Sequence, residues 1–441
     1  MTGVLAEKLS CIEKKFWLPA SEILEIAMKF KKEMAEGLSG KSSLKMLRTF
    51  LQTTDGRETG TFLAIDFGGT NIRLQLVDLF GGGRFEIRKQ QSFLLKDPCG
   101  AYDYTSQDAN AGDLFDFIAI QIANLLEHDS TYPLGHTFSF PCRQIGANRA
   151  VLLNWTKEFK TSGVEGQEIT GLLERSLAKK SLFNVKPVAI INDTTGTLLT
   201  AAYCDPCADI GSISGTGHNS CYIEPKEPSS QGPMIINMES GNFNKLSLTY
   251  YDKILDQASE KPGEQLLEKA ASGRYIGEIF RLILTDLIQQ RLLFKEKIPD
   301  FVAAADSIAA GDLAFMLADE TPDLAHISGW LKTNWGVKGS TPEERQALQR
   351  IASLVTTRSA RLIAATYVGI VRHVDPELNR NHVIGADGSL FEKMPGYVAN
   401  IDNVFKEIYR DNSNRVSLVL TKNGSGIGAA IAAATCMGKG N

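Results

Sequence analysis

The stretch Phe62-Leu63-Ala64-Ile65-Asp66-Phe67-Gly68-Gly69-Thr70-Asn71-Ile72-Arg73-Leu74-Gln75-Leu76-Val77 places two runs of strand-forming residues around a short polar turn. This order predicts a β-hairpin. The glycines let backbone N–H groups of the turn approach an anionic ligand closely. Asp66, at the end of the first strand, suits hydrated Mg²⁺, which few carboxylates and a nucleotide's phosphates commonly hold. Gly-Gly alone indicates an ordinary hairpin, but Asp66, Thr70, Asn71 and Arg73 together favour a phosphate-binding hairpin.

The size and composition limit the possible classes of protein. With 441 residues the chain is too long for one compact core, which indicates two domains or one domain with a large extension. Its 43% hydrophobic and 22% charged content is typical of soluble globular proteins. A net charge of −4 leaves no basic excess to neutralise nucleic-acid phosphates. Because there is no apolar leader and no run approaching roughly 20 apolar residues, we expect a cytoplasmic protein with no membrane or nucleic-acid partner.

The seven cysteines are scattered and odd in number. This pattern favours free thiols in a reducing compartment over a disulfide framework. Cys204 and Cys207 have the spacing of a redox motif or of half a zinc site, but no second pair or nearby histidine completes one. We therefore expect no metal at these cysteines.

Two other nucleotide-binding motifs fail on their context. Gly40-Lys41-Ser42 resembles the end of a P-loop, but Ala35 replaces the first glycine and a helix, not a strand, precedes it. Gly424-Ser425-Gly426 begins a dinucleotide fingerprint after a strand, but the chain ends before the required second strand and acidic residue. A close approach of backbone to a nucleotide at this last helix N-terminus remains predicted.

Helical and strand patterns alternate along the chain. Apolar spacing predicts helices over 21–38, 114–126, 166–178, 246–293 with a break near 262–263, and 352–371. Further strands are predicted at 85–95, 188–191, 382–386 and 416–420. A second strand, turn and strand, 209–223 around Gly215-Thr216-Gly217, repeats the opening hairpin. Two such hairpins indicate a duplicated architecture in which each half supplies one side of a phosphate clamp.

Asp193 is the first candidate for chemistry. It follows Asn192 at the end of an apolar run that predicts a buried parallel strand, and ligands gather at the carboxyl ends of such strands. A carboxylate there can orient a hydroxyl and accept its proton, which phosphoryl transfer requires. A helix N-cap before Thr194-Thr195 explains the same tripeptide equally well. Lys157 is a candidate for stabilising a moving phosphoryl group, although a lone lysine is usually solvated.

A further set of side chains suits a polyhydroxy substrate, although each is weak alone: Ser139, Thr156, Asn192, Asn237, Glu239 and Glu268.

These residues resemble the eukaryotic-type hexokinases, including glucokinase, in consistent order from about residue 20 to 437. The first phosphate motif of that family is similar to 65–73, its sugar signature to 134–142 with 152–160, and its base segment to 191–194. The second phosphate motif is similar to 214–217, and the adenosine region to 385–389 with 424–426.

The resemblance implies an α/β actin-like ATPase (ribonuclease H-like) fold with two domains around a cleft. A small domain would comprise 61–196 plus 425–441, within a hexokinase N-terminal half at about 20–205. A large domain would comprise 1–60 plus 197–424, with the C-terminal half at about 207–437. The partners implied are a hexose and Mg-ATP.

The resemblance also assigns roles. Asp193 would be the base on the 6-hydroxyl of the sugar, and Lys157 would contact sugar and phosphoryl group. The sugar would be held by Ser139, Phe140, Thr156, Lys157, Asn192, Asp193, Asn237, Glu239 and Glu268. ATP would be held by Asp66, Phe67, Gly68, Gly69, Thr70, Asn71, Arg73, Gly215, Thr216, Gly217, Gly273, Arg274, Gly388, Ser389, Gly424 and Ser425, with Asp66 reaching Mg²⁺ through water.

Two segments depart from the family pattern. Residues 238–244 replace a Thr-Glu-Trp-Gly-Ala-Phe-Gly-like loop with Met-Glu-Ser-Gly-Asn-Phe-Asn, keeping Glu239 but losing the tryptophan. His218 stands where the family often has a small residue or cysteine. The loop borders the expected sugar, so sugar preference depends on it.

The function predicted is ATP-dependent phosphorylation of a hexose, D-glucose first, at the 6-hydroxyl, the first step of glycolysis, by a monomer or homodimer. The alternatives are a catalytically weak sugar sensor on the same fold and a different actin-like ATPase. Retention of Asp193, Lys157 and Asp66 disfavours the sensor, and the sugar residues disfavour the other ATPases.

Overall fold

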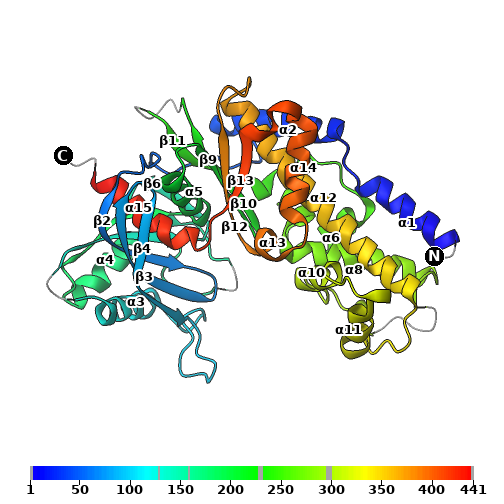
Figure 1. Ribbon diagram of the computed structural model, residues 1–441. Helices are drawn as coiled ribbons and strands as arrows, with labels where there is room; N and C mark the ends of the chain where they lie inside the picture. Colours follow the sequence, from blue (N-terminus) through cyan, green and yellow to red (C-terminus); the bar gives the residue numbers. More distant parts are fainter. Residues whose placement is uncertain (1–2, 128–129, 157–158, 227–231, 295–299, 439–441) are drawn as a thin grey trace.

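The computed structural model describes residues 3–127, 130–156, 159–226, 232–294 and 300–438. Within these ranges the chain forms a five-stranded sheet, a six-stranded sheet and a two-stranded ribbon, with helices between and around the sheets (Figure 1). The ribbon consists of β6 (Cys142–Gly146) and β7 (Arg149–Leu152).

The two large sheets share one topology. The five-stranded sheet has, in order, β4 (Arg84–Leu94), β3 (Asn71–Gly81), β2 (Thr59–Phe67), β5 (Tyr132–Phe138) and β8 (Val185–Ile191). The six-stranded sheet has β1 (Leu47–Arg48), β11 (Met234–Asn237), β10 (His218–Glu224), β9 (Ala208–Ser214), β12 (His382–Asp387) and β13 (Val416–Leu420). In each sheet three consecutive antiparallel strands are followed by two parallel strands that extend the sheet beside the first. This repeat confirms the duplicated architecture, and the α/β fold is that of the predicted class.

The five-stranded sheet is covered on both faces because successive side chains of a strand point to opposite sides. On β2, Leu63 and Ile65 belong to the core cluster that includes α3 (Ala111–Leu125) and α4 (Ile169–Lys179). Phe62 and Ala64 belong instead to the cluster that includes α5 (Asp193–Cys204) and α15 (Gly424–Met437). The strand is therefore buried from both sides.

Helices α5 and α15 lie between the two large sheets (Figure 1). Helix α15 packs on β2, β5 and β8, whereas α5 packs on β9 and β12. The two helices meet at glycines, because a Cβ on Gly428 would lie 2.0 Å from the Gly196 carbonyl oxygen and one on Gly196 would lie 2.9 Å from Ser425 Cα. Only glycine permits this crossing, which brings the first turns of both helices together.

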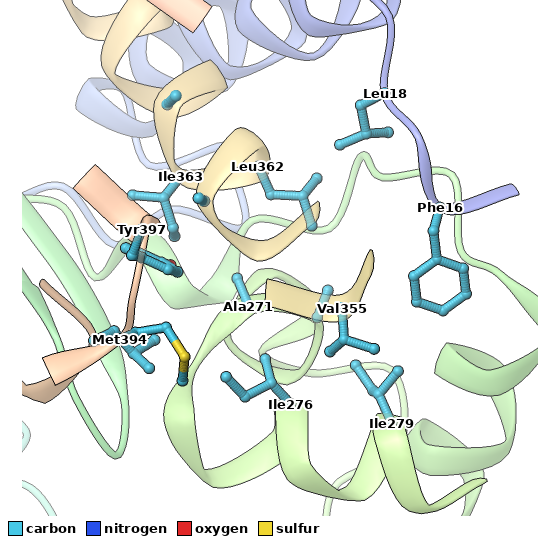
Figure 2. Packing of buried hydrophobic residues seen from close by; sticks show 14 of the residues in the cluster. Phe16, Leu18, Ala271, Ile276, Ile279, Val355, Leu362, Ile363, Met394 and Tyr397 are labelled. Carbon is cyan, nitrogen blue, oxygen red and sulfur yellow. The ribbon is translucent and has the colours of Figure 1, made fainter. Parts of the chain in front are cut away.

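The largest core cluster lies among the remaining helices and one face of the six-stranded sheet. These helices are α1 (Gly3–Phe16), α2 (Ala20–Leu38), α6 (Tyr250–Ala258), α7 (Leu266–Ala271), α8 (Gly273–Gln289), α9 (Asp300–Ala303), α10 (Ala310–Leu317), α11 (Ala325–Trp335), α12 (Pro342–Val374), α13 (Ser389–Lys393) and α14 (Tyr397–Tyr409), with short 3-10 turns at Ser240–Asn242, Pro322–Leu324 and Arg410–Arg415. Figure 2 shows the centre of this cluster, where Val355 of α12 lies beside Ile276 and Ile279 of α8. The long α12 thus connects helices that are distant in sequence.

The predicted helices and strands are present, but the predicted helix 246–293 is divided into three helices, α6, α7 and α8, and the bounds of other elements differ. No helix is predicted before Ser21, yet α1 is there, and Leu5, Leu9, Ile12 and Phe16 on one face carry the signal that identifies it. Helix α12 is longer than the predicted 352–371, because a capping box of Thr341 and Glu344 starts it at Pro342.

All seven cysteines are free thiols, as expected. Among the described residues, His, Cys, Asp and Glu side chains form no cluster of three or more that could hold a metal. Within the same ranges, no helix combines the length and the apolarity needed to cross a bilayer. The division into a small and a large domain remains a proposal, which the two sheets and their separate core clusters support.

Candidate active site

The carboxyl ends of β2, β5 and β8 meet at one edge of the five-stranded sheet. In the parallel ladders Asp66 pairs with Thr137, and Thr137 pairs with Ile191. Ser139 and Asn192 follow directly after β5 and β8. Three of the predicted site residues therefore stand at neighbouring strand ends, where ligands of such sheets bind.

Asp193 opens helix α5, but its neighbour caps the helix. The N-cap is Asn192, whose Oδ1 accepts hydrogen bonds from the backbone N–H and the hydroxyl of Thr194, at 2.9 Å and 2.6 Å. Asp193 Oδ1 accepts a second bond from the same N–H at 2.8 Å. The N-cap role that the sequence also allowed for Asp193 therefore belongs largely to Asn192. The Asp193 carboxylate, in the first turn of α5, is stabilised by the helix dipole.

Asn237 and Glu239 form a hydrogen-bonded group with a residue that was not predicted. Asn237 Nδ2 donates to Glu239 Oε1 at 2.9 Å. Asn219 Nδ2 donates to Asn237 Oδ1 at 2.9 Å and to Glu239 Oε1 at 3.3 Å. The only sequence signal for Asn219 is its amide just after the second glycine turn, because its contact with Asn237 depends on the pairing of β10 with β11.

Two other carboxylates, those of Asp193 and Glu268, act on Glu239 in this region. Burial raises the pKa of Glu239, and the negative charges of Asp193 and Glu268 raise it further, against the hydrogen bond from Asn237. Glu268 Oε2 accepts the backbone N–H of His218 at 2.9 Å. The proposed base and both acidic sugar residues therefore lie close enough to interact electrostatically.

A small cavity of about 30 Å³ is lined by residues from both sheets at this point. Four predicted substrate residues line it, Phe140 and Asn192 from the five-stranded side and Asn237 and Glu239 from the six-stranded side. The remaining lining residues are Leu47, Phe138, Cys142, Gln144, Ala150, Ile190 and Ile191.

Two other predicted sugar residues do not line this cavity, and a third lies outside the described residues. Ser139 is half-buried between β5 and Phe140. Thr156 is half-buried, and its carbonyl accepts the N–H of Phe159 at 3.2 Å. Lys157 lies outside the described residues, so its predicted contacts with sugar and phosphoryl group stay predictions.

The first phosphate turn lies between β2 and β3. The N–H of Gly68 donates to the carbonyl of Asn71 at 3.1 Å, which closes the turn, while Gly69 and Thr70 form its tip. Phe67 is fully buried beneath it and packs edge-on against Phe138 and Phe140. Of the predicted nucleotide residues, Phe67 can therefore contribute only its backbone, because its ring belongs to the core.

The second phosphate turn lies between β9 and β10 and is held by its neighbours. The N–H of Gly215 donates to the Gly217 carbonyl at 3.0 Å. At the start of α8, the N–H groups of Gly273 and Arg274 donate to the carbonyls of Gly215 and Thr216, at 2.7 Å and 3.1 Å. The predicted pair Gly273-Arg274 is thus joined directly to the turn.

Asp66 is linked to the last helix, whose residues are distant in sequence. Ser425 Oγ donates to Asp66 Oδ2 at 3.0 Å, and Arg73 Nη1 lies 3.7 Å from the same oxygen. Arg73 also donates to Asn423 Oδ1 at 3.2 Å. The predicted metal-side carboxylate and the C-terminal phosphate segment therefore form one group.

Asp387 completes this network, although it was not among the predicted site residues. Its carboxylate accepts the N–H groups of Gly388 at 2.7 Å and Gly424 at 3.3 Å. The next residue, Ser389, begins α13, and its hydroxyl lies close to Gly215. Burial raises the pKa of Asp387 to about 6, and the charges of Glu392 and Asp193 add to this effect.

Asp193 thus acts electrostatically on both sides of the site. Its charge raises the pKa of Glu239 among the sugar residues and that of Asp387 among the nucleotide residues. Asp193 also follows Asn192, which lines the cavity, in the first turn of α5, and this turn packs on Ser425 of α15. This placement suits a proton acceptor at a phosphoryl-transfer centre.

Comparisons with known proteins identify the family. Two models, both described as hexokinase, match residues 8–203 and 209–435. The chain belongs to the hexokinase family.

Hexokinases of several organisms are similar over nearly the whole chain. Hexokinase-1 of Schizosaccharomyces pombe is 34% identical, over 98% of this chain and 92% of its own length. The hexokinase of Schistosoma mansoni is 35% identical, over 98% of both chains. Hexokinase-2 of Rattus norvegicus is 34% identical over 93% of this chain, which spans only 46% of that relative. The chain therefore spans about half the length of this relative and nearly all of the other two.

Solved hexokinase structures share the fold. A hexokinase crystal structure superimposes with a TM-score of 0.87 at 32% identity, covering 98% of this chain and 99% of the other. The Schistosoma mansoni hexokinase in complex with glucose gives a TM-score of 0.83 at 34% identity, covering 98% and 99%. The predicted actin-like fold is thereby confirmed.

Proposed function

We propose that this member of the hexokinase family transfers the γ-phosphoryl group of ATP to the 6-hydroxyl of a hexose, giving hexose 6-phosphate and ADP. D-Glucose is the proposed hexose, and the Schistosoma mansoni relative solved with glucose supports this choice. The observation that carries the proposal is the position of Asp193, whose charge acts on Glu239 of the sugar group and on Asp387 of the nucleotide group.

The sugar is held first by the buried polar group. Asn219 and Asn237 already share their amides with Glu239, so this constellation is fixed before a ligand arrives. Preorganised polar groups bind hydroxyls without further loss of side-chain entropy. Phe140, across the cavity, supplies an apolar wall.

The transfer itself needs one proton acceptor. Asp193 accepts the proton of the 6-hydroxyl as that oxygen forms a bond to the γ-phosphorus, and the bond from the γ-phosphorus to the bridging oxygen of ADP breaks. Backbone N–H groups of the two glycine turns approach the phosphates, and positioning of this kind supplies most of the catalysis in phosphoryl transfer. Lys157 is the proposed cation beside the moving group.

Asp66 is the residue proposed to serve Mg²⁺. A single, partly exposed carboxylate at a strand end, beside expected phosphates, fits an ion that retains several waters and takes few protein ligands. The hydroxyl of Ser425 orients the carboxylate. When bound with ATP, Mg²⁺ neutralises phosphate charge.

The test is a hexose panel with purified protein and Mg-ATP, in which sugar-dependent ADP formation and the phosphorylated product are measured. We expect turnover with D-glucose and identification of the 6-phosphate. If no common hexose supports ADP formation, the proposal is wrong.

Three further properties are proposed with this function. The nucleotide is used as Mg-ATP, the protein acts in the cytoplasm, and it is a monomer or homodimer, which light scattering after size exclusion decides. No observation among the described residues favours the sugar-sensor alternative, and the retention of Asp66 and Asp193 in the sequence disfavours it.

A further inference from the structure

His218 connects the second phosphate turn to the loop that carries Glu239. It is the first residue of β10 and its ring is buried. Its Nδ1 lies 3.1 Å from the Ile213 carbonyl oxygen and 3.0 Å from Ser214 Oγ, on the strand that leads into the turn. Its Nε2 lies 3.2 Å from Ser240 Oγ, in the loop after Glu239. One imidazole therefore reaches from the phosphate turn to the sugar loop.

These neighbours fix the protonation of the ring. A carbonyl oxygen only accepts hydrogen bonds, so Nδ1 carries the proton and donates to Ile213. Nε2 is then an acceptor, and the Ser240 hydroxyl donates to it. Burial lowers the pKa of His218 to about 4, despite the bond to the Ile213 carbonyl, so the ring is neutral at physiological pH.

The residue before Ser240 is strained. Glu239 has φ 54° and ψ 51°, the left-handed conformation that residues other than glycine rarely adopt. Such a conformation persists only where the surroundings hold it. Ser240 is anchored twice, by its hydroxyl on His218 and by its N–H on Asn219 Oδ1 at 3.2 Å. The anchor of Ser240 therefore supports the conformation that aims Glu239.

The backbone of His218 holds the second acidic residue. Its N–H donates to Glu268 Oε2 at 2.9 Å, and Gly217 before it lies so close that a Cβ there would be 2.7 Å from that oxygen and would displace the Glu268 carboxylate. Both acidic sugar residues are thus connected to His218, one through its side chain and one through its backbone.

We propose that His218 is a positioning residue for the hexose: its Nε2 holds Ser240, and through Ser240 it holds Glu239 in the conformation that binds the sugar. The proposal rests on the function proposed above and assigns to this residue the sugar affinity rather than the chemical step. A small side chain or cysteine, as the family often has here, is too short to bridge Ser214 and Ser240. In this chain the altered loop 238–244 is therefore held by a contact that such a residue cannot make.

The test compares H218A, S240A and the double variant with the wild type. H218A and S240A each remove the buried hydrogen bond between His218 Nε2 and the Ser240 hydroxyl. Each single variant is therefore expected to raise the KM for glucose about tenfold. The double variant is expected to be no worse than H218A, since both substitutions remove the same bond. The kcat and the KM for ATP stay within about twofold. S220A is the matched control, because the hydroxyl of this buried serine on the same strand contacts Ser212 Oγ, and its backbone bond to the Met238 N–H is kept in the variant.

Two further measurements keep the test decisive if H218A folds poorly. H218Q, which retains a donor and an acceptor, is expected to recover part of the glucose affinity. Nitrogen-15 spectra of labelled histidine are expected to show His218 as the neutral Nδ1–H tautomer from pH 5.5 to 8, with Nε2 shifting in S240A.

The outcomes that overturn the proposal are separate from failure of the enzyme function. Independent effects of H218A and S240A that multiply, or a rise in the KM for ATP equal to that for glucose, would refute it. If the wild type forms no ADP with any sugar, the enzyme proposal fails. In that case an Nε2–H tautomer, or no response of Nε2 to S240A, overturns the His218 assignment on its own.

Discussion

Replacing Asp193 by alanine separates the chemistry from the fold. Among the described residues its carboxylate accepts one hydrogen bond, from the Thr194 N–H that also donates to Asn192 Oδ1. Loss of that bond costs α5 at most about 1 kcal/mol, because the N-cap remains. Loss of a general base lowers kcat by roughly 10²–10⁴-fold, or about 3–5 kcal/mol on the barrier. A large kinetic effect is therefore expected beside a small effect on stability.

The assay follows ADP formation with glucose and measures glucose binding by calorimetry without ATP. We expect the glucose affinity of D193A to stay within about threefold of the wild type while kcat falls as calculated. Asp205, at the other end of α5, provides the control D205A, whose kcat is expected to be unchanged. A kcat for D193A within tenfold of the wild type, or a raised KM with unchanged kcat, would show that Asp193 is not the base.

The removal of this charge has a second consequence that does not depend on turnover. The carboxylate of Asp193 contributes to the raised pKa of Glu239 and of Asp387. In D193N both pKa values are expected to fall towards the ordinary value of a carboxyl group. Carbonyl carbon-13 titration of the two side chains measures this, and unchanged values would contradict the placement of Asp193 between them.

Three further predictions concern the surroundings of the site. In G217A the new Cβ would lie 2.7 Å from Glu268 Oε2, so the KM for glucose is expected to rise several-fold with a smaller change in kcat, measured in the same assay. In R358M the buried Asp252 loses its bidentate partner, at 2.9 Å and 2.7 Å, and denaturant unfolding is expected to show a loss of about 3–5 kcal/mol, whereas a loss below 1 kcal/mol would contradict it. Burial raises the pKa of Asp387 in the folded state to about 6, so the folded state favours the protonated carboxyl group. The stability that this protonation contributes is complete below the pKa of the unfolded state and is lost as pH rises through about 6. The stability of the wild type relative to D387N is therefore expected to fall between pH 4 and 7 in thermal melts, and a rise would reverse the sign argued here.

Much of the fold follows from local sequence. Alternation over 62–67 and 72–77 places the two strands, and the polar residues between them place the turn. Helix α2 and the strands β12 and β13 are equally local, because apolar spacing and glycine positions determine them. The missed α1 had the same kind of signal, whereas the start of α12 had its own capping box.

Parts of the site were accessible from sequence for the same reason. Asp66 lies at the end of β2, and Asn192 and Asp193 follow β8, so their chemistry and their position at a sheet edge follow from neighbouring residues. Phe67 shows the limit of this approach, because its place in a motif does not reveal that its ring is fully buried.

The tertiary structure alone decided which distant residues meet. Ser425 donates to Asp66 across 359 positions of sequence, and Asp387 accepts the N–H of Gly424, because α15 crosses α5 at glycines. No local period encodes such contacts, since they depend on how two complete sheets pack around two helices. The sequence by itself determined the hairpin at 62–77, which is predicted to bind phosphate, and the candidate base, and only the packing decided which side chains hold them in place.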